Sequence, residues 1–127
     1  PPDANSIQVC YDWGLTTRNK GVVITASKSP LPIRTTLEQT RQAIAQGAIT
    51  LQETSGSKTV VFAVVGDMTL LPVYEAATQL AAQGVGVRIV SVVNPRRLYR
   101  STDVAWDTCS EADGGFLDDA GFEALFG

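Results

Sequence analysis

Residues 59–93, TVVFAVVGDMTLLPVYEAATQLAAQGVGVRIVSVV, decide the fold that the sequence predicts. Two apolar runs, 60–65 and 87–93, flank a segment whose apolar residues recur with a helical period. Strands that are apolar on both faces are typical of parallel sheets covered by helices on both sides. We therefore expect a βαβ unit, in which a right-handed crossover joins two neighbouring parallel strands.

The ends of the helix in this unit carry matching signals. Asp67 or Thr69 can accept hydrogen bonds from the free N–H groups at its start, and Gly84 can adopt the left-handed conformation at its end. Asp67 could instead lie in a cleft as an acid or a metal ligand. Arg88 is unusual in a buried strand, so we expect it where the strand meets a neighbouring element or a partner.

The segments before this unit supply further elements. Residues 1–20 lack clear periodicity and predict a loop or arm, in which the alternating residues 7–13 could form a short edge strand. The β-branched run 21–26 predicts the first strand of the sheet. Thr35 and Glu38 have the spacing of a capping box for a helix that runs to about Gln46 and ends at Gly47.

The remaining segments complete one α/β domain over residues 1–127. Residues 48–53 alternate and predict a minor strand, and Asp118 and Asp119 can cap a short final helix. The expected architecture is a three-layer α/β/α fold with an open, mostly parallel sheet of about five strands. Because the chain begins at Pro1 without Met, we expect it to be a fragment of a longer protein.

The composition excludes several classes of function. The net charge is −3 and the Lys and Arg residues are scattered, so no nucleic-acid partner is expected. No apolar run is long enough for a bilayer and no signal peptide is visible, which predicts a cytoplasmic protein without a membrane partner. Cys10 and Cys109 are expected to be reduced thiols. The chain has no histidine, which excludes His-dependent catalytic pairs and His-ligated metals.

Three polar residues follow predicted strands. Ligands of open α/β sheets collect beyond the carboxyl ends of the strands, and Lys28, Asp67 and Asn94 all fall there. We therefore take these three residues as candidates that face a substrate or a cleft. Lys28 could meet a phosphate group, although a solvated loop lysine is the simpler interpretation.

The order of four stretches resembles the C-terminal region of phosphoketolases, in the thiamine-diphosphate transketolase superfamily. The stretches are TRNKGVVITASKSP at 17–30, VFAVVGDMT at 61–69, VRIVSVVN at 87–94 with Leu98, and FEALF at 122–126. They resemble the family's Asn-rich turn with its Lys-Gln-Pro loop, its Gly-Asp strand, its Arg-containing strand and its Phe-x-x-Leu-Phe helix. Ser29 stands where the family has Gln.

The resemblance implies an accessory part of an enzyme that cleaves xylulose 5-phosphate or fructose 6-phosphate with phosphate to give acetyl phosphate. Such enzymes use thiamine diphosphate and Mg²⁺, which other domains bind. The C-terminal domain of these enzymes, which is the third along the chain and the one that this sequence resembles, supports a homodimer and holds no cofactor, catalytic residue or metal. Lys28 corresponds to the family's loop lysine at the edge of the active-site cleft.

Two alternatives stay open at this point. The chain could be the C-terminal domain of a transketolase-type enzyme. It could also be a stand-alone regulatory or small-ligand-binding α/β module, whose site would lie near Lys28, Asp67 and Asn94.

Overall fold

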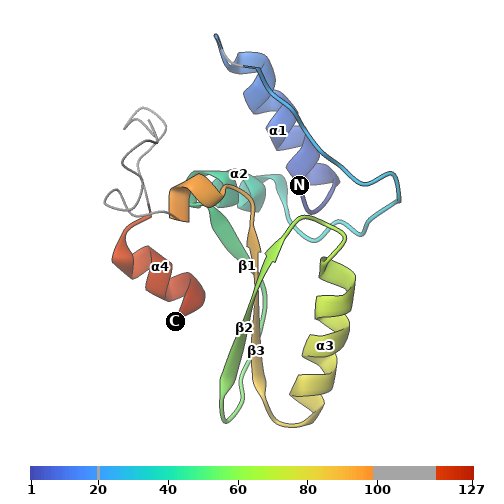
Figure 1. Ribbon diagram of the computed structural model, residues 1–127, viewed down its shortest axis with the longest axis vertical. Coiled ribbons are helices and arrows are strands. Elements are labelled where there is room, and N and C mark those ends of the chain that lie inside the picture. Colours follow the sequence, from blue (N-terminus) through green and yellow to red (C-terminus); the bar gives the residue numbers. More distant parts are fainter. Residues whose placement is uncertain (20, 99–116) are drawn as a thin grey trace.

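The computed structural model describes residues 1–19, 21–98 and 117–127 (Figure 1). Its elements in chain order are α1 (Ala4–Thr16), α2 (Leu37–Gln46), β1 (Ala48–Thr54), β2 (Thr59–Val65), α3 (Leu70–Ala82), β3 (Gly86–Val92), the 3₁₀ helix η1 (Pro95–Leu98) and α4 (Asp119–Phe126). The described residues form an α/β fold with four α-helices and an open mixed sheet. None of the helices in these ranges is long and apolar enough to cross a bilayer.

The βαβ unit is confirmed. β2 and β3 are parallel neighbours, paired from Thr59 opposite Gly86 to Val65 opposite Val92. The intervening helix α3 packs along the sheet (Figure 1), and its Ala77 is fully buried against Val87 and Ile89. The apolar runs form parallel strands here because each can bury a face against a helix.

The sheet is smaller and more mixed than the sequence predicts. The described residues form three strands in the order β1-β3-β2, and β1 runs antiparallel to β3 with a bulge between Thr50 and Gln52. The prediction of about five mostly parallel strands is therefore wrong for this part of the chain. The minor strand predicted at 48–53 is confirmed, but it is an antiparallel strand rather than part of a parallel set.

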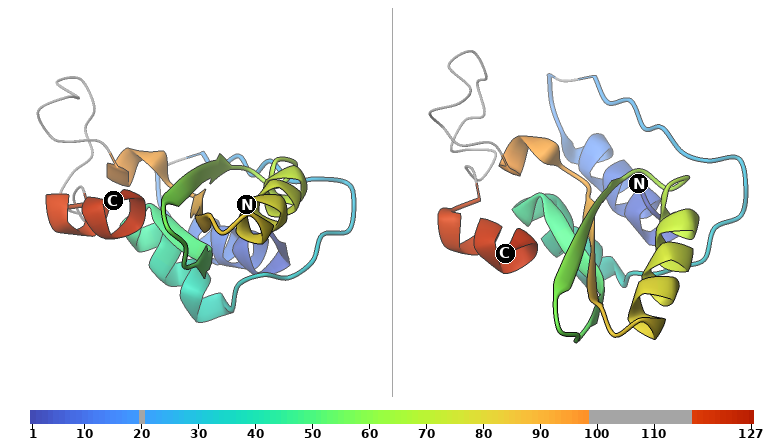
Figure 2. Two further views of the ribbon diagram at one scale, coloured as in Figure 1. Left: turned by 90° about the horizontal axis from the view of Figure 1, so that it is seen from below. Right: turned by 60° about the horizontal axis from the view of Figure 1, so that its bottom comes forward.

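The strand predicted at residues 21–26 is not formed. This segment has no regular secondary structure, and the side chain of Val23 is 93% exposed. Its β-branched composition suits a strand, but a strand is stable only when another strand pairs with it. The segment instead passes beside α1 (Figure 2). Val22 lies close to Gly14 of this helix.

The N-terminal arm predicted for residues 1–20 is mostly helix. α1 begins after Asp3, whose side chain accepts a hydrogen bond from the backbone N–H of Ser6. Val9 is buried, whereas Tyr11 and Trp13 are exposed at 58% and 48%. The alternation of apolar residues 7–13 therefore does not reflect a strand, and Trp13 does not fill a local core.

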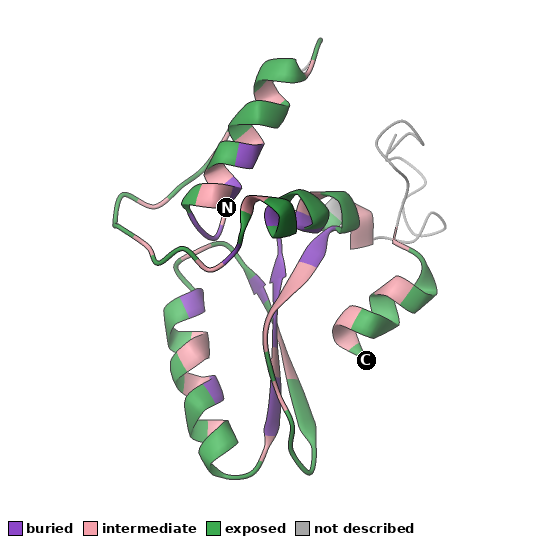
Figure 3. Ribbon diagram, turned by 180° about the vertical axis from the view of Figure 1, so that it is seen from behind, coloured by how far each residue is buried: buried purple, intermediate pink, exposed green. Residues whose placement is uncertain are grey.

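Helices cover both faces of the sheet, and β3 is the buried central strand (Figure 3). Val87 and Ile89 point to α3, whereas the alternate residues Val90 and Val92 pack with residues of η1 and α4. Arg88 shares this second face. It binds Glu53 of β1 at 2.7 Å and donates to the Gly127 carbonyl beyond α4 at 2.9 Å, which confirms its predicted place beside a neighbouring element.

The helix ends confirm the predicted glycines and the cap of α4, and they correct the capping box of α2. Gly47 and Gly84 have φ of 101° and 77° and follow α2 and α3. The capping box of α2 is formed by Thr36 and Gln39, not by Thr35 and Glu38, because Thr35 binds Asp3 instead. Asp118 caps α4 as predicted, by accepting a hydrogen bond from the N–H of Gly121.

Candidate functional site

The candidate site lies where the carboxyl end of β2 meets α1 and the loop that leads to α2 (Figure 1). Asp67, just beyond β2, accepts a hydrogen bond of 3.0 Å from the backbone N–H of Ser27. The neighbouring Ser27 hydroxyl lies 3.8 Å from the Met68 sulfur and accepts from the N–H of Ser29. Asp67 thus holds the 27–29 loop beside the strand end.

This arrangement corrects the predicted cap of α3. The N-cap position belongs to Thr69, but its backbone is helical and no side chain accepts from the first N–H groups. The Thr69 hydroxyl donates to the Val65 carbonyl at 3.2 Å instead. The Asp67 carboxylate binds the 27–29 loop and does not cap α3. The N–H of Leu70, at the start of α3, donates to the backbone carbonyl of Asp67.

Beside the loop, Asp3 forms a buried polar centre with α1 and the start of α2. Its side chain is 1% exposed. One carboxylate oxygen accepts from the N–H and the hydroxyl of Ser6 at 2.9 and 2.7 Å. The other accepts from the N–H of Arg34 at 2.9 Å, and from the N–H and hydroxyl of Thr35 at 2.9 and 2.8 Å. Five donors thus compensate one buried carboxylate.

The electrostatics of Asp3 follow from this geometry. Burial by itself raises the pKa of the carboxyl group, because removal from water disfavours the charge. The hydrogen bonds from Ser6, Arg34 and Thr35 favour the charged form and together outweigh burial, so the pKa of Asp3 lies below its ordinary value. Asp3 is therefore a structural anion that joins α1 to the segment before α2.

A second contact holds the same segment against α3. The guanidinium carbon of Arg34 lies 4.0 Å from the centre of the Tyr74 ring, within the range of a cation–π interaction. Tyr74 also packs against the apolar core beneath α3, as expected for a core residue. Arg34 thus contributes its backbone to Asp3 and its side chain to α3.

Between these contacts lies a shallow pocket of about 260 Å³. Its walls come from the start of α1, the 27–31 loop and the end of β2, and they consist of Pro1, Asp3, Ala4, Ile7, Ser27, Ser29, Pro30, Leu31 and Asp67. We call it the strand-end pocket. It is mainly apolar, and the oxygens of Asp3 are already taken up by five donors.

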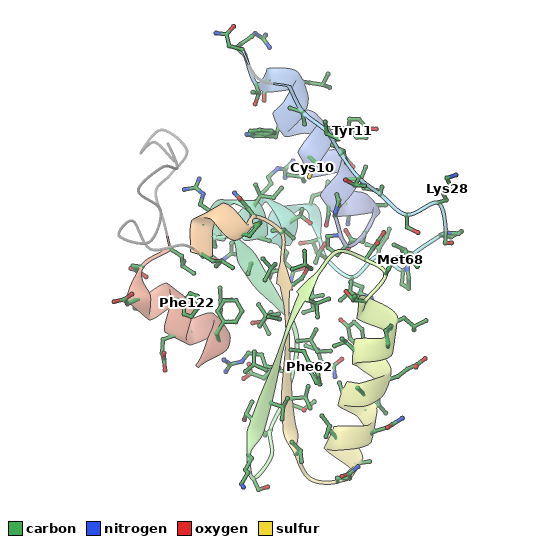
Figure 4. The ribbon with its side chains drawn as sticks, viewed as in Figure 1. Cys10, Tyr11, Lys28, Phe62, Met68 and Phe122 are labelled. Carbon is green, nitrogen blue, oxygen red and sulfur yellow. The ribbon has the colours of Figure 1, made fainter. Side chains whose placement is uncertain are left out.

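The three predicted site residues do not converge. Asp67 lines the strand-end pocket, but Lys28 does not, although both of its neighbours do. The Lys28 side chain is exposed and points away from the protein (Figure 4). Asn94 follows β3 at the same end of the sheet. Its side-chain amide donates to the Ile44 carbonyl at 3.4 Å, and its backbone N–H donates to the Gly47 carbonyl.

The sequence does not single out Asp3, Arg34 and Thr35 as residues of the site. The sequence does contain a signal for Asp3. An Asp at the N-cap of a helix commonly accepts a hydrogen bond from the backbone N–H of the second or third helical residue, as Asp3 does from Ser6. No local pattern predicts that the backbone of Arg34 and Thr35 supplies the other donors. These contacts join residues separated by more than thirty positions.

The described residues do not fit a site for thiamine diphosphate and Mg²⁺. Mg²⁺ in phosphate-containing sites has near-octahedral coordination, with one or two carboxylates beside water and phosphate oxygens. Within residues 1–19, 21–98 and 117–127, no group of three or more His, Cys, Asp or Glu side chains could hold a metal. The two carboxylates at the pocket are committed, Asp3 to its five donors and Asp67 to Ser27.

Cys10 is a half-buried free thiol on α1. Burial raises its pKa, so it is held in the protonated, weakly nucleophilic form. Cys109 lies outside the described residues. The hydrogen bonds of Asp3 and Asp67 thus order the segments around the strand-end pocket.

Comparisons with protein-family models, curated proteins and solved structures found no match to the chain.

Proposed function

We propose that the chain is the C-terminal accessory domain of a phosphoketolase-like enzyme, which cleaves xylulose 5-phosphate or fructose 6-phosphate with phosphate to give acetyl phosphate. The observation that supports this best is the βαβ unit. Two of the resembling stretches, 61–69 and 87–94, form or directly follow adjacent parallel strands, so Gly66-Asp67 and Asn94 lie at one end of the sheet. A C-terminal accessory domain needs loops at this end of the sheet to border the active-site cleft, but it needs no catalytic cluster of its own.

The exposed apolar side chains offer a second line of support. Tyr11, Trp13 and Leu15 on the outer half of α1 are all exposed, the last at 75%. Tyr11 and Leu15 are one helical turn apart and share a face of α1. Exposed apolar groups on one face are typical of surfaces that another domain or protein covers. We assign them to contacts with the other domains of the same enzyme, whose homodimer this domain would help to hold together in the cytoplasm.

In this proposal the cofactor chemistry belongs to other domains. Thiamine diphosphate and Mg²⁺ would supply the carbon–carbon cleavage there, and this chain would shape the rim of the cleft. Lys28 would reach the phosphate of the sugar substrate, since its ammonium group is exposed on a loop that Asp67 fixes. The finer fold, a mostly parallel three-layer sheet like that of transketolase C-terminal domains, would require strands beyond the three described.

Calorimetry tests whether the cofactor is bound by this chain or by other domains. Thiamine diphosphate with Mg²⁺, titrated into the isolated chain, should give no binding heat, because the carboxylates of the strand-end pocket are committed to backbone donors. Mg²⁺ alone and thiamine diphosphate alone serve as controls. Tight binding of the complete cofactor would overturn the accessory assignment.

A second candidate function is a stand-alone module that binds a small ligand. The strand-end pocket favours it, since it is concave, mainly apolar and bordered by Ser27, Ser29 and Asp67. Its volume of about 260 Å³ suits only a small molecule. The gene upstream of the codon for Pro1 separates the two functions, because a long open reading frame supports the enzyme and a nearby start codon supports the module.

A further inference from the structure

The outer edge of β2 is unpaired in the described structure. β2 pairs with β3 on one side only, since the strand order is β1-β3-β2. An unpaired edge exposes a row of backbone N–H and C=O groups that can pair with another strand. Val65 is 69% exposed and Val60 and Ala63 are also exposed, so the other described elements leave these residues of β2 uncovered.

The two edges of the sheet differ in their protection. β1 carries the charged Glu53, has a bulge between Thr50 and Gln52, and contacts α2 and α4. These are the usual devices that prevent edge pairing. β2, with the sequence TVVFAVV, has no charge, no proline and no irregularity in its pairing with β3. The chain thus blocks one edge and leaves the other suited to pairing.

The charges beside β2 indicate which strand fits this edge. Lys58 precedes β2 and Asp67 follows it, so the strand has a positive end and a negative end. A second β2 in antiparallel orientation brings Lys58 of each copy near Asp67 of the other. Parallel pairing would place like charges together, which is unfavourable.

We propose that β2 is a self-association edge, at which a second copy of the chain pairs its own β2 in antiparallel orientation. A two-fold axis normal to the sheet, close to Phe62 and Ala63, relates the copies and joins two three-stranded sheets into one of six strands. The inference stands on the edge of β2 alone and does not require the proposed enzyme.

Ala63→Lys is the variant that tests this edge. Residue 63 is exposed and lies on the sheet face opposite to α3, next to the two-fold axis, so the lysines of the two copies repel each other without disturbing the core. Gln79→Lys adds the same charge on the exposed side of α3 and is the matched control. Circular dichroism spectra and melting curves establish that both variants are folded.

Analytical ultracentrifugation over a wide concentration range supplies the measurement. We expect the wild-type chain and Gln79→Lys to form dimers, and Ala63→Lys to dissociate at least tenfold more readily. Hydrogen exchange on the wild type is the second measurement, since the outward N–H groups of β2 should exchange more slowly as concentration rises. A wild-type monomer, an assembly larger than a dimer, or a dimer that Ala63→Lys leaves intact would each overturn the inference.

Discussion

The carboxylate of Asp3 and the backbone N–H of Thr35 meet at 2.9 Å, although 32 positions separate the two residues. The contact ties the first turn of α1 to the residue that precedes the N-cap of α2. The same carboxylate caps α1 itself through Ser6. One buried side chain therefore fixes two helices relative to each other, and with them one wall of the strand-end pocket.

Asp3→Asn should destabilise the chain by about 2 to 3 kcal/mol. The change removes the negative charge, and the NH₂ group of the new amide faces the N–H and hydroxyl donors that bind the carboxylate. Urea unfolding followed by circular dichroism measures this loss. Asp12→Asn, an exposed change on the same helix, is the control and should cost less than about 0.5 kcal/mol. Equal stability of the two variants would show that Asp3 is not an anchor.

The depressed pKa of Asp3 predicts a loss of stability in acid. Asp3 is a weaker base in the folded state than in the unfolded chain. Its contribution to stability is therefore complete above its ordinary pKa of 3.8 and declines as pH falls toward the lower folded value. Unfolding free energies measured from neutral pH into this acidic range should therefore fall. Asp3→Asn should show a shallower decline there, and parallel curves would contradict the prediction.

Arg88 connects the sheet to the last helix. Its guanidinium binds Glu53 and donates to carbonyls of Ala124, Leu125 and Gly127 at the end of α4. Arg88→Met should cost about 1 to 2 kcal/mol and speed hydrogen exchange in α4, because the helix end loses its positive partner.

Arg41→Met is the control for this change, since Arg41 is exposed and its guanidinium lies 4.0 Å from the Glu38 carboxylate. It should leave α4 unchanged. Unaltered exchange in α4 of Arg88→Met would mean that apolar packing of Leu125 and Phe126 holds the helix alone.

Asp67→Ala should release the 27–29 loop without unfolding the chain. The change removes the acceptor of the Ser27 N–H, a loss of about 1 kcal/mol, so that amide should exchange roughly fivefold faster. Glu75→Ala on the exposed side of α3 is the control. If the Ser27 amide exchanges at the same rate in both variants, the loop is held by other contacts.

The sequence predicts the parts of the fold that local pattern specifies. The βαβ unit, the helix ending at Gly47 and the helix capped by Asp118 are confirmed, because each combines hydrophobic periodicity with a cap or a glycine. α1 was missed because its apolar residues fit a period of two as well as a helical period. Burial of Ser6 and Val9, three positions apart, fits the helical period and not a period of two.

The rest depends on contacts between distant segments, which no local pattern contains. Residues 21–26 have strand composition but no strand beside them. The site prediction placed Lys28, Asp67 and Asn94 together because all three follow predicted strands. The structure leaves Lys28 in solvent and turns Asn94 toward Ile44, so Asp67 alone of the three lines the pocket.

The proposed role as an accessory domain is tested most directly by reconstitution. A phosphoketolase that lacks its C-terminal domain is mixed with this chain, and acetyl phosphate formation from fructose 6-phosphate and phosphate is measured with thiamine diphosphate and Mg²⁺ present. We predict that the chain restores activity in proportion to its concentration, and that Lys28→Ala raises the KM for the sugar phosphate. No gain in activity at saturating chain, with the chain folded and bound to the truncated enzyme, would contradict the proposal.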